Sequence, residues 1–299
     1  MPASLGFSTT ACPGWELRRM VETAQRLGFS GIELALGDGG GEGGSVPLWG
    51  AAAAVREMLA GAGLCVCSLA TSRRLDAEGG DWKRERAALA DALGLARELG
   101  APLVTVRPIE RRRGERMDRL LVRMAERLRE VAGDACGEAS GPAGRGGVMI
   151  VVPNGGGLRR ARDLWTLLEA ADAAHAGVCW DAGTAGDSPG LGVQTMNYRL
   201  KLARVWDYVS GGDAGAAEAL PRAAALGTGV VAGRLMVQRA RGIGFGGCIV
   251  YAPPPGATPA EEAEELLEAA GRALKGWSGP PAAPVSGQKK QTVRNPAPT

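Results

Sequence analysis

Residues Trp82–Arg107, WKRERAALADALGLARELGAPLVTVR, contain the unit that decides the fold. A helical pattern runs from Trp82 to Leu99 and stops at Gly100, a residue type that often ends helices because it adopts the left-handed conformation easily. The apolar run Pro102–Arg107 follows at once and is typical of a buried strand. This step from helix to strand recurs along nearly the whole chain.

Short strand-like runs alternate with longer helical patterns on both sides of this unit. We expect strands at Leu5–Thr9, Gly31–Leu34, Leu64–Leu69, Pro102–Arg107, Val148–Val152, Gly177–Asp181, Leu202–Trp206 and Cys248–Tyr251. We expect helices near Trp15–Leu27, Pro47–Ala62, Trp82–Leu99, Glu115–Val131, Leu158–Ala171, Gly192–Lys201, Val230–Arg241 and Pro259–Leu274. Such alternation favours parallel strands with helical crossovers, and eight units predict an α/β fold, a single-domain (β/α)8 TIM barrel over residues 1–276.

A doubly wound open sheet is the competing architecture. A dinucleotide-binding sheet of this kind has a Gly-x-Gly-x-x-Gly turn directly after a strand. The nearest match in this sequence, Gly242–Gly247, comes before a strand instead. The closed barrel is therefore preferred. The Pro- and Lys-rich segment 277–299 is expected to be a disordered tail, and Gly37–Gly44 a low-complexity loop.

The composition is that of an ordinary globular protein, with 299 residues, 45% of them apolar and 22% charged. The net charge of +3 matches the three cations of the tail, Lys289, Lys290 and Arg294, so the remainder is about neutral. This gives no electrostatic case for nucleic acid or anionic membranes as partners. Six cysteines without a Cys-x-x-Cys pair, and no signal-peptide pattern, favour the cytoplasm.

Several segments resemble the sugar phosphate isomerase/epimerase (xylose isomerase-like) family. Leu5–Thr9, Cys12–Leu17 and Leu27–Leu34 are similar to its first βα unit. Cys179–Gly183, CWDAG, resembles its sixth-strand Trp-Asp-x-Gly motif, and Leu226–Gly229, LGTG, resembles the turn before its seventh helix. The resemblance covers almost the whole barrel and is silent on the substrate.

The resemblance implies a divalent ion (Mn, Co, Mg or Zn) at the C-terminal mouth of the barrel. In the family a Glu after strand five, an Asp after strand six, a His on strand seven and a Glu after strand eight hold it. Pro153, Arg204 and Tyr251 stand at three of these positions, so Asp181 is the only retained ligand. Proline offers no side-chain donor and arginine is a permanent cation, so we do not expect a metal at the family's usual site, and no cofactor is predicted.

The candidate catalytic residues are Asp181 and Glu33 as bases, with Arg107 and Arg204 stabilising the charge of an enediolate. An Asp181–Arg204 pair would place a cation where the family has its ion. The structural alternative for Asp181 is a cap on the next loop or a simple ion pair, and for Glu33 a cap or a solvated acid.

The candidate substrate-binding residues are Trp206, Tyr251, Asn154 and Asp207. Asn154 begins a glycine run before a helix, where backbone amides bind anions. Asp207 could join Asp181 in a displaced metal site, with a loop cap as its alternative. The sequence leaves open whether Asp181, Arg204, Trp206 and Tyr251 surround an open pocket or fill it.

Arginines gather in the segments that follow strands three, four and five: Arg73, Arg74, Arg107, Arg111, Arg112, Arg113, Arg159 and Arg160. They suggest an anionic ligand, but acids lie in the same loops, so a mixed-charge rim is expected for all of them except Arg107. The only histidine, His175, precedes strand six on the opposite face of the barrel. This excludes the several-histidine zinc sites of DNA-repair enzymes and excludes Ser-His-Asp catalysis at the mouth.

These observations predict a sugar isomerase/epimerase-like barrel with a degenerate metal site, which binds a small carbohydrate-like or anionic ligand. If active, it would work by proton transfer without the usual metal. The alternative is a catalytically silent barrel, a pseudoenzyme that serves as a ligand-binding or assembly module. Homo-oligomerisation stays open.

Overall fold

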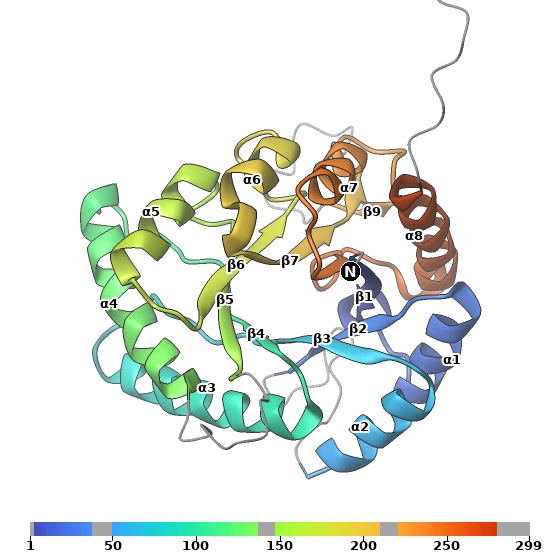
Figure 1. The fold of residues 1–299 in the computed structure, drawn as a ribbon, viewed down its shortest axis with the longest axis horizontal. Helices are drawn as coiled ribbons and strands as arrows, with labels where there is room; N and C mark the ends of the chain where they lie inside the picture. The colour runs from blue at the N-terminus through green and yellow to red at the C-terminus, as the bar shows by residue number, and fades with distance from the viewer. Residues whose placement is uncertain (1–2, 38–49, 137–146, 210–220, 280–299) are drawn as a thin grey trace, which may run out of the picture.

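The computed structural model describes residues 3–37, 50–136, 147–209 and 221–279. Within these residues eight parallel strands close into a barrel in the order β1-β10-β7-β6-β5-β4-β3-β2. Figure 1 shows the strands at the centre and the helices around them. The predicted (β/α)8 barrel is confirmed.

The elements follow each other as strand and helix along the chain. The barrel strands are β1 (Ser4–Ser8), β2 (Gly31–Ala35), β3 (Cys65–Ala70), β4 (Leu103–Thr105), β5 (Met149–Pro153), β6 (Ala176–Asp181), β7 (Leu200–Val205) and β10 (Cys248–Tyr251). The helices are α1 (Leu17–Leu27), α2 (Ala52–Gly61), α3 (Gly79–Leu99), α4 (Met117–Cys136), α5 (Ala161–Ala171), α6 (Pro189–Met196), α7 (Gly233–Gly242) and α8 (Ala263–Ser278). An unpredicted antiparallel hairpin, β8 (Asp207–Tyr208) with β9 (Ala223–Ala224), follows β7.

Glycines end two of the helices as expected. Gly28 after α1 has φ 67° and Gly100 after α3 has φ 73°, and each N–H bonds to carbonyls of the last turn. Other residues pay about 1–2 kcal/mol for this left-handed conformation. The two helix ends that were predicted from these glycines are confirmed.

Several boundaries differ from the prediction, and two of them have a clear physical reason. α6 begins at Pro189, which lacks the N–H that a first helical residue does not need, and it ends at Met196; Leu200 and Lys201 join β7 instead. α8 runs to Ser278, past the predicted domain end at residue 276, because Trp277 packs on the core. Most of the glycine-rich loop and of the tail lies outside the described residues.

Side chains of the strands alternate between two apolar clusters. The inner one, inside the barrel, contains Cys67, Leu103, Val151, Cys179, Leu202, Cys248, Val250 and Ala252. The outer one packs the remaining strand side chains against the helices. Because alternate residues face opposite sides, this pattern decides which residues at the strand ends reach the mouth. No described helix is long and apolar enough to cross a bilayer.

Candidate functional site

A cavity of about 470 Å³ opens at the C-terminal ends of the barrel strands. Its lining includes six of the residues that the sequence indicated: Glu33, Arg107, Asn154, Asp181, Arg204 and Trp206. TIM barrels carry their sites at this end, because the loops that follow the strands converge there. The pocket is therefore open rather than filled.

An ion pair crosses the floor of this cavity. Arg204 on β7 donates from Nη2 and Nε to one oxygen of Glu33 on β2, at 2.8 and 3.2 Å. The Glu33 side chain is 1% exposed and that of Arg204 16%. Burial by itself would lower the pKa of Arg204, but Cys179, Glu33 and Asp181 raise it above its ordinary value.

The prediction that Arg204 pairs with Asp181 is wrong, because Arg204 pairs with Glu33. The two residues are register partners on neighbouring strands, β6 and β7. The guanidinium nevertheless forms its hydrogen bonds with Glu33, which comes from across the barrel. Inward-facing side chains of a closed barrel meet across its interior, so sheet neighbours need not be side-chain partners.

In Asp181, at the end of β6, one carboxylate oxygen accepts hydrogen bonds from the protein and the other is left for a ligand. Its Oδ1 accepts hydrogen bonds from the Gly183 N–H at 2.8 Å and from the Trp206 indole N–H at 3.1 Å. Among the described residues no donor bonds to its Oδ2. Burial raises the pKa of Asp181 to about 6, and nearby Arg204 opposes this rise. This carboxyl group therefore changes its protonation near pH 6.

Asn154 orders the backbone around Asp181. Its Nδ2 donates to the Asp181 carbonyl at 2.8 Å, and its Oδ1 accepts from the Asp181 N–H at 2.5 Å. Thr184 adds hydrogen bonds to the Asn154 side chain and to its carbonyl. Asn154 thus positions Asp181, and its amide is largely occupied by the protein itself.

Trp206 covers Asp181 from one side, and Gly183 makes room for it. A Cβ atom at position 183 would overlap the Trp206 indole ring. The glycine of the Trp-Asp-x-Gly motif therefore has a physical reason in this chain: it lets the indole N–H reach the carboxylate.

Tyr251 does not reach the cavity. It is completely buried in the outer cluster with the helices, and the next residue, Ala252, faces the cavity instead. The prediction that Tyr251 binds substrate is wrong, because alternation along β10 turns it away from the barrel interior. Burial raises the pKa of its hydroxyl, which has no hydrogen-bond partner among the described residues.

Asp207 is a buried anchor for a turn. Its carboxylate accepts the N–H groups of Gly227, Gly229 and Val231 at 2.9–3.0 Å, and also that of Tyr208. It lies outside the lining of the cavity, so its predicted substrate contact is not supported. The loop cap that the sequence left as its alternative is what the geometry shows.

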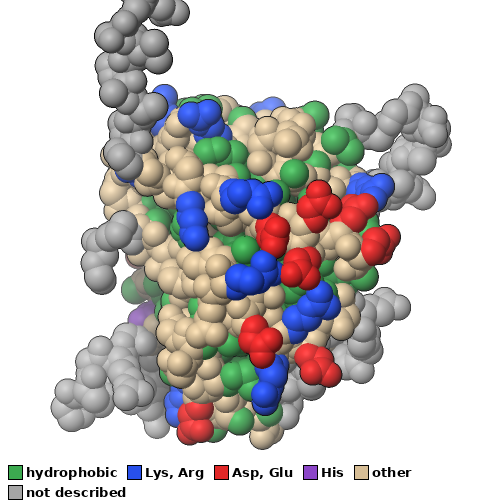
Figure 2. Space-filling view, turned by 90° about the vertical axis from the view of Figure 1, so that its right-hand side faces the viewer, with side chains coloured by type: hydrophobic (Ala, Val, Ile, Leu, Met, Phe, Trp, Pro, Cys, Tyr) green, Lys and Arg blue, Asp and Glu red, His purple; other side chains and the backbone are tan. Residues whose placement is uncertain are grey.

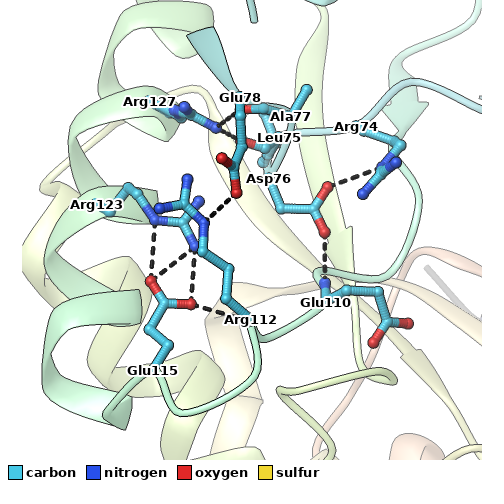
Figure 3. A network of polar contacts seen from close by, with 10 residues as sticks. All are labelled: Arg74, Leu75, Asp76, Ala77, Glu78, Glu110, Arg112, Glu115, Arg123 and Arg127. Atoms are coloured by element: carbon cyan, nitrogen blue, oxygen red, sulfur yellow. Dashed lines mark hydrogen bonds and ion pairs between the residues drawn. The ribbon is translucent and has the colours of Figure 1, made fainter. Parts of the chain in front are cut away.

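The rim around β3 and β4 carries paired charges, as expected. Figure 3 shows Arg74 beside Asp76 and Arg112 beside Glu78, at 3.0 and 2.5 Å. Arg107 is different, since it lines the cavity and no acid of the described residues lies in salt-bridge range. Within the described part of the chain no group of three His, Cys, Asp or Glu side chains could hold a metal ion.

Several hydroxyl groups on the cavity wall were not predicted. Ser8, Thr10, Thr71 and Thr105 stand at or just beyond the ends of β1, β3 and β4. Thr10 donates to the Pro253 carbonyl at 2.9 Å and so ties the loop after β10 to the one after β1. In the sequence these residues are marked only as Ser or Thr near a strand end. That pattern is too common to identify site residues by itself.

Comparisons with known proteins find the same architecture. A model of the xylose isomerase-like TIM barrel family matches residues 21–273. The chain is similar to the IOLI protein solved with a bound zinc atom (TM-score 0.75, 13% identity, 92% of this chain and 98% of that one). It is also similar to D-psicose 3-epimerase from Clostridium cellulolyticum H10 (TM-score 0.66, 17% identity, 92% and 98%).

One similar structure is longer than this chain. The fusion protein of a xylose isomerase-like TIM barrel with 4-hydroxyphenylpyruvate dioxygenase aligns with a TM-score of 0.68 and 17% identity. The match covers 90% of this chain and 42% of the fusion protein. At these identities the solved structures establish the fold alone. No curated protein sequence matches.

Proposed function

Because the chain belongs to the xylose isomerase-like TIM barrel family, we propose that its mouth binds a small carbohydrate-like ligand and moves a proton on it without a divalent metal. The reaction class is isomerisation or epimerisation next to a carbonyl group. The protein is thus a sugar isomerase/epimerase-like barrel with a degenerate metal site.

The observation that carries this proposal is the state of Asp181. A general base works best when its pKa lies near the working pH, and burial brings the pKa of Asp181 to about 6. Gly183 and Trp206 fix its Oδ1, which leaves Oδ2 for a proton of the ligand. The carboxylate lines an open cavity large enough for a small sugar.

The residues at the family's ligand positions do not fit a divalent ion. Pro153 has no donor side chain, and the inward residue at the end of β10 is Ala252. A buried guanidinium, Arg204, occupies the strand-seven position and would repel a cation. Asp181 alone remains, and one carboxylate does not make a stable site.

Arg204 supplies the positive charge that the reaction needs. Glu33 uses its Nε and Nη2, while Nη1 has no acceptor among the described residues. A largely buried donor of this kind stabilises an enediolate oxygen strongly, because its charge is fixed in place by Glu33 and shielded from solvent. Arg107 at the rim is placed to hold an anionic end of the ligand, such as a carboxylate or a phosphate.

The proton transfer follows from these positions. Asp181 takes a proton from the carbon beside the carbonyl group, the electrons move onto the carbonyl oxygen, and Arg204 stabilises that oxygen. Return of the proton to the former carbonyl carbon, together with transfer of the neighbouring hydroxyl's proton to the former carbonyl oxygen, completes an isomerisation. Glu33 is hydrogen-bonded to Arg204, so Asp181 is the one carboxylate left to act as a base, which favours isomerisation over a two-base epimerisation.

The test is carbon-bound hydrogen exchange in D2O, followed by NMR. EDTA-treated protein is incubated with aldoses, ketoses, their phosphates and sugar acids, and we expect one class to take up deuterium. D181N should abolish the exchange. D91N, which changes an exposed aspartate of α3, is the matched control and should keep it.

Exchange that appears only after a divalent metal is added would contradict the metal-free mechanism. The second candidate function is a catalytically silent ligand-binding or assembly barrel, favoured by the buried ion pair in which Glu33 and Arg204 neutralise each other. It predicts no exchange with any sugar. Melting temperatures measured with and without ligands then distinguish a ligand-binding module from an assembly module. Only the ligand-binding module would be stabilised by a sugar or an anion.

A further inference from the structure

Three thiols meet at the end of the barrel opposite the cavity. Cys65 and Cys67 come from the start of β3, and Cys248 is the first residue of β10. A Cβ atom at Gly31 would lie 3.2 Å from the Cys248 sulfur and 3.5 Å from that of Cys65, and would overlap the Cys67 sulfur. The sulfurs thus surround one point, which stays free because residue 31 is a glycine.

The three thiols form a row from the solvent to the barrel interior. Cys65 is exposed, and its sulfur donates to the Ser30 carbonyl at 3.2 Å. It also contacts the Cys67 side chain. The sulfurs of Cys67 and Cys248 are 2.6 Å apart, and these two residues are only 4% and 7% exposed. Cys179, the other cysteine inside the barrel, is not part of this row.

We propose that this row is a thiol–disulfide exchange site that accepts a small-molecule disulfide at Cys65 and stores the oxidation as a Cys67–Cys248 disulfide. The short separation of the buried sulfurs leaves no room for another group between them. A disulfide needs them at about 2.05 Å, which is a small movement. The exposed thiol is the one that a soluble disulfide can reach.

The exchange balances in three steps. The Cys65 thiolate attacks a disulfide R–S–S–R, forms a mixed disulfide and releases one RS⁻. The Cys67 thiolate attacks the Cys65 sulfur and releases the second RS⁻. The Cys248 thiolate attacks the Cys67 sulfur and returns Cys65 to a thiolate. Cys67 and Cys248 together lose two protons and two electrons, and one R–S–S–R becomes two thiols.

The surroundings make the site slow at neutral pH. The hydrogen bond with Cys67 and burial both raise the pKa of Cys65. Because the thiolate is the attacking species, the rate should rise with pH. Once formed, the disulfide would connect β3 with β10 across β1 and β2, which lie between them in the sheet. It would thus staple the barrel at the end away from the cavity.

Oxidised glutathione is the probe for this proposal. Reduced full-length protein is incubated with it at about pH 8.5, near the ordinary thiol pKa. Intact mass should fall by two hydrogens with no retained glutathione, and peptide mapping should link Cys67 to Cys248. The melting temperature should rise, and a reductant should reverse the change. If no disulfide-linked Cys67–Cys248 peptide forms in the wild-type protein, the proposed exchange site is wrong.

Variants separate the route from the buried pair. C67S should accumulate glutathione on Cys65, and C65S should still form the Cys67–Cys248 disulfide but about tenfold more slowly. C179S removes a buried cysteine outside the row and should match the wild type. Equal oxidation rates for C65S and wild type would overturn the relay. The site lies away from the cavity, so these results do not depend on the proposed reaction.

Discussion

At the scale of the residue, burial controls the charge of Asp181. Its folded pKa of about 6 lies above the value near 4 of an unfolded aspartate. The folded protein therefore holds this proton more tightly than the unfolded chain does. The associated stability is present below about pH 4 and is lost as the pH rises toward 6.

D181N should remove the loss of stability that the wild type shows as the pH rises, because the amide carries no charge. Its oxygen can still accept hydrogen bonds from Gly183 and Trp206. Relative to wild type, D181N should gain on the order of 2–3 kcal/mol of unfolding free energy above pH 6 and nothing below pH 4. Urea unfolding across this pH range measures it. A difference that does not vary with pH would contradict the raised pKa. For the wild type, kcat/KM should rise through pH 6.

The Glu33–Arg204 pair gives a second prediction at this scale. R204M leaves the Glu33 carboxylate buried without a partner, which should cost about 3–5 kcal/mol of unfolding free energy. The double variant E33Q/R204M should recover most of that cost, because no charge stays buried. Chemical denaturation of both variants tests this. Additive effects of the two substitutions would show that the side chains are not coupled.

At the scale of the element, tryptophan rings decide where glycine is needed. Trp180 of β6 is fully buried, and its indole N–H donates to the Pro189 carbonyl at the start of α6 at 3.0 Å. A Cβ atom at Gly192 in α6 would overlap that ring. The close approach of α6 to β6 therefore depends on this glycine, although glycine is a poor helix former.

G192A should destabilise the protein by about 1–3 kcal/mol, since the methyl group overpacks against Trp180. G94A, in the middle of α3, is the matched control, because a Cβ atom there meets nothing within 4 Å. It should stabilise the protein by about 0.5–1 kcal/mol through helix propensity. Thermal melts of the two variants should shift in opposite directions, and a gain in G192A would refute the contact.

At the scale of the whole molecule, the barrel closes where the two ends of the fold meet. β1 pairs with β10, and α1 lies beside α8. Arg26 of α1 bonds Glu264 and Glu268 of α8, both at 2.6 Å. Figure 2, which views this side, shows basic and acidic side chains interspersed over it. Below them Phe29 packs edge-on against Phe7 at 5.3 Å.

We expect the apolar contacts to hold this closure, since exposed ion pairs are screened by solvent. F29A should cost about 3–5 kcal/mol of unfolding free energy, because it leaves a cavity behind. R26A should cost only a small fraction of that, and less still in high salt. Denaturation with urea at low and high salt compares the two. A larger loss of unfolding free energy in R26A than in F29A would show that the ion pairs, and not the apolar contacts, hold the closure.

The candidate site could be predicted in part. Strand ends are visible in the sequence, so Glu33, Asp181 and Arg204 were placed at the mouth correctly. Successive side chains of a strand face opposite sides, so a difference of one residue changes the face: the family resemblance puts Tyr251 at the mouth, whereas the structure puts Ala252 there. The amide contacts of Asp207 come from a turn twenty residues further along the chain, which no local pattern indicates.

The sequence by itself determined the alternation of strands and helices and the glycine helix ends, because each depends on residues near one another in the chain. Tertiary structure alone decided that Arg204 pairs with Glu33, 171 residues away, and that three thiols gather around Gly31. Closing a barrel brings distant strands together across its interior, and the register of that closure fixes which side chains meet.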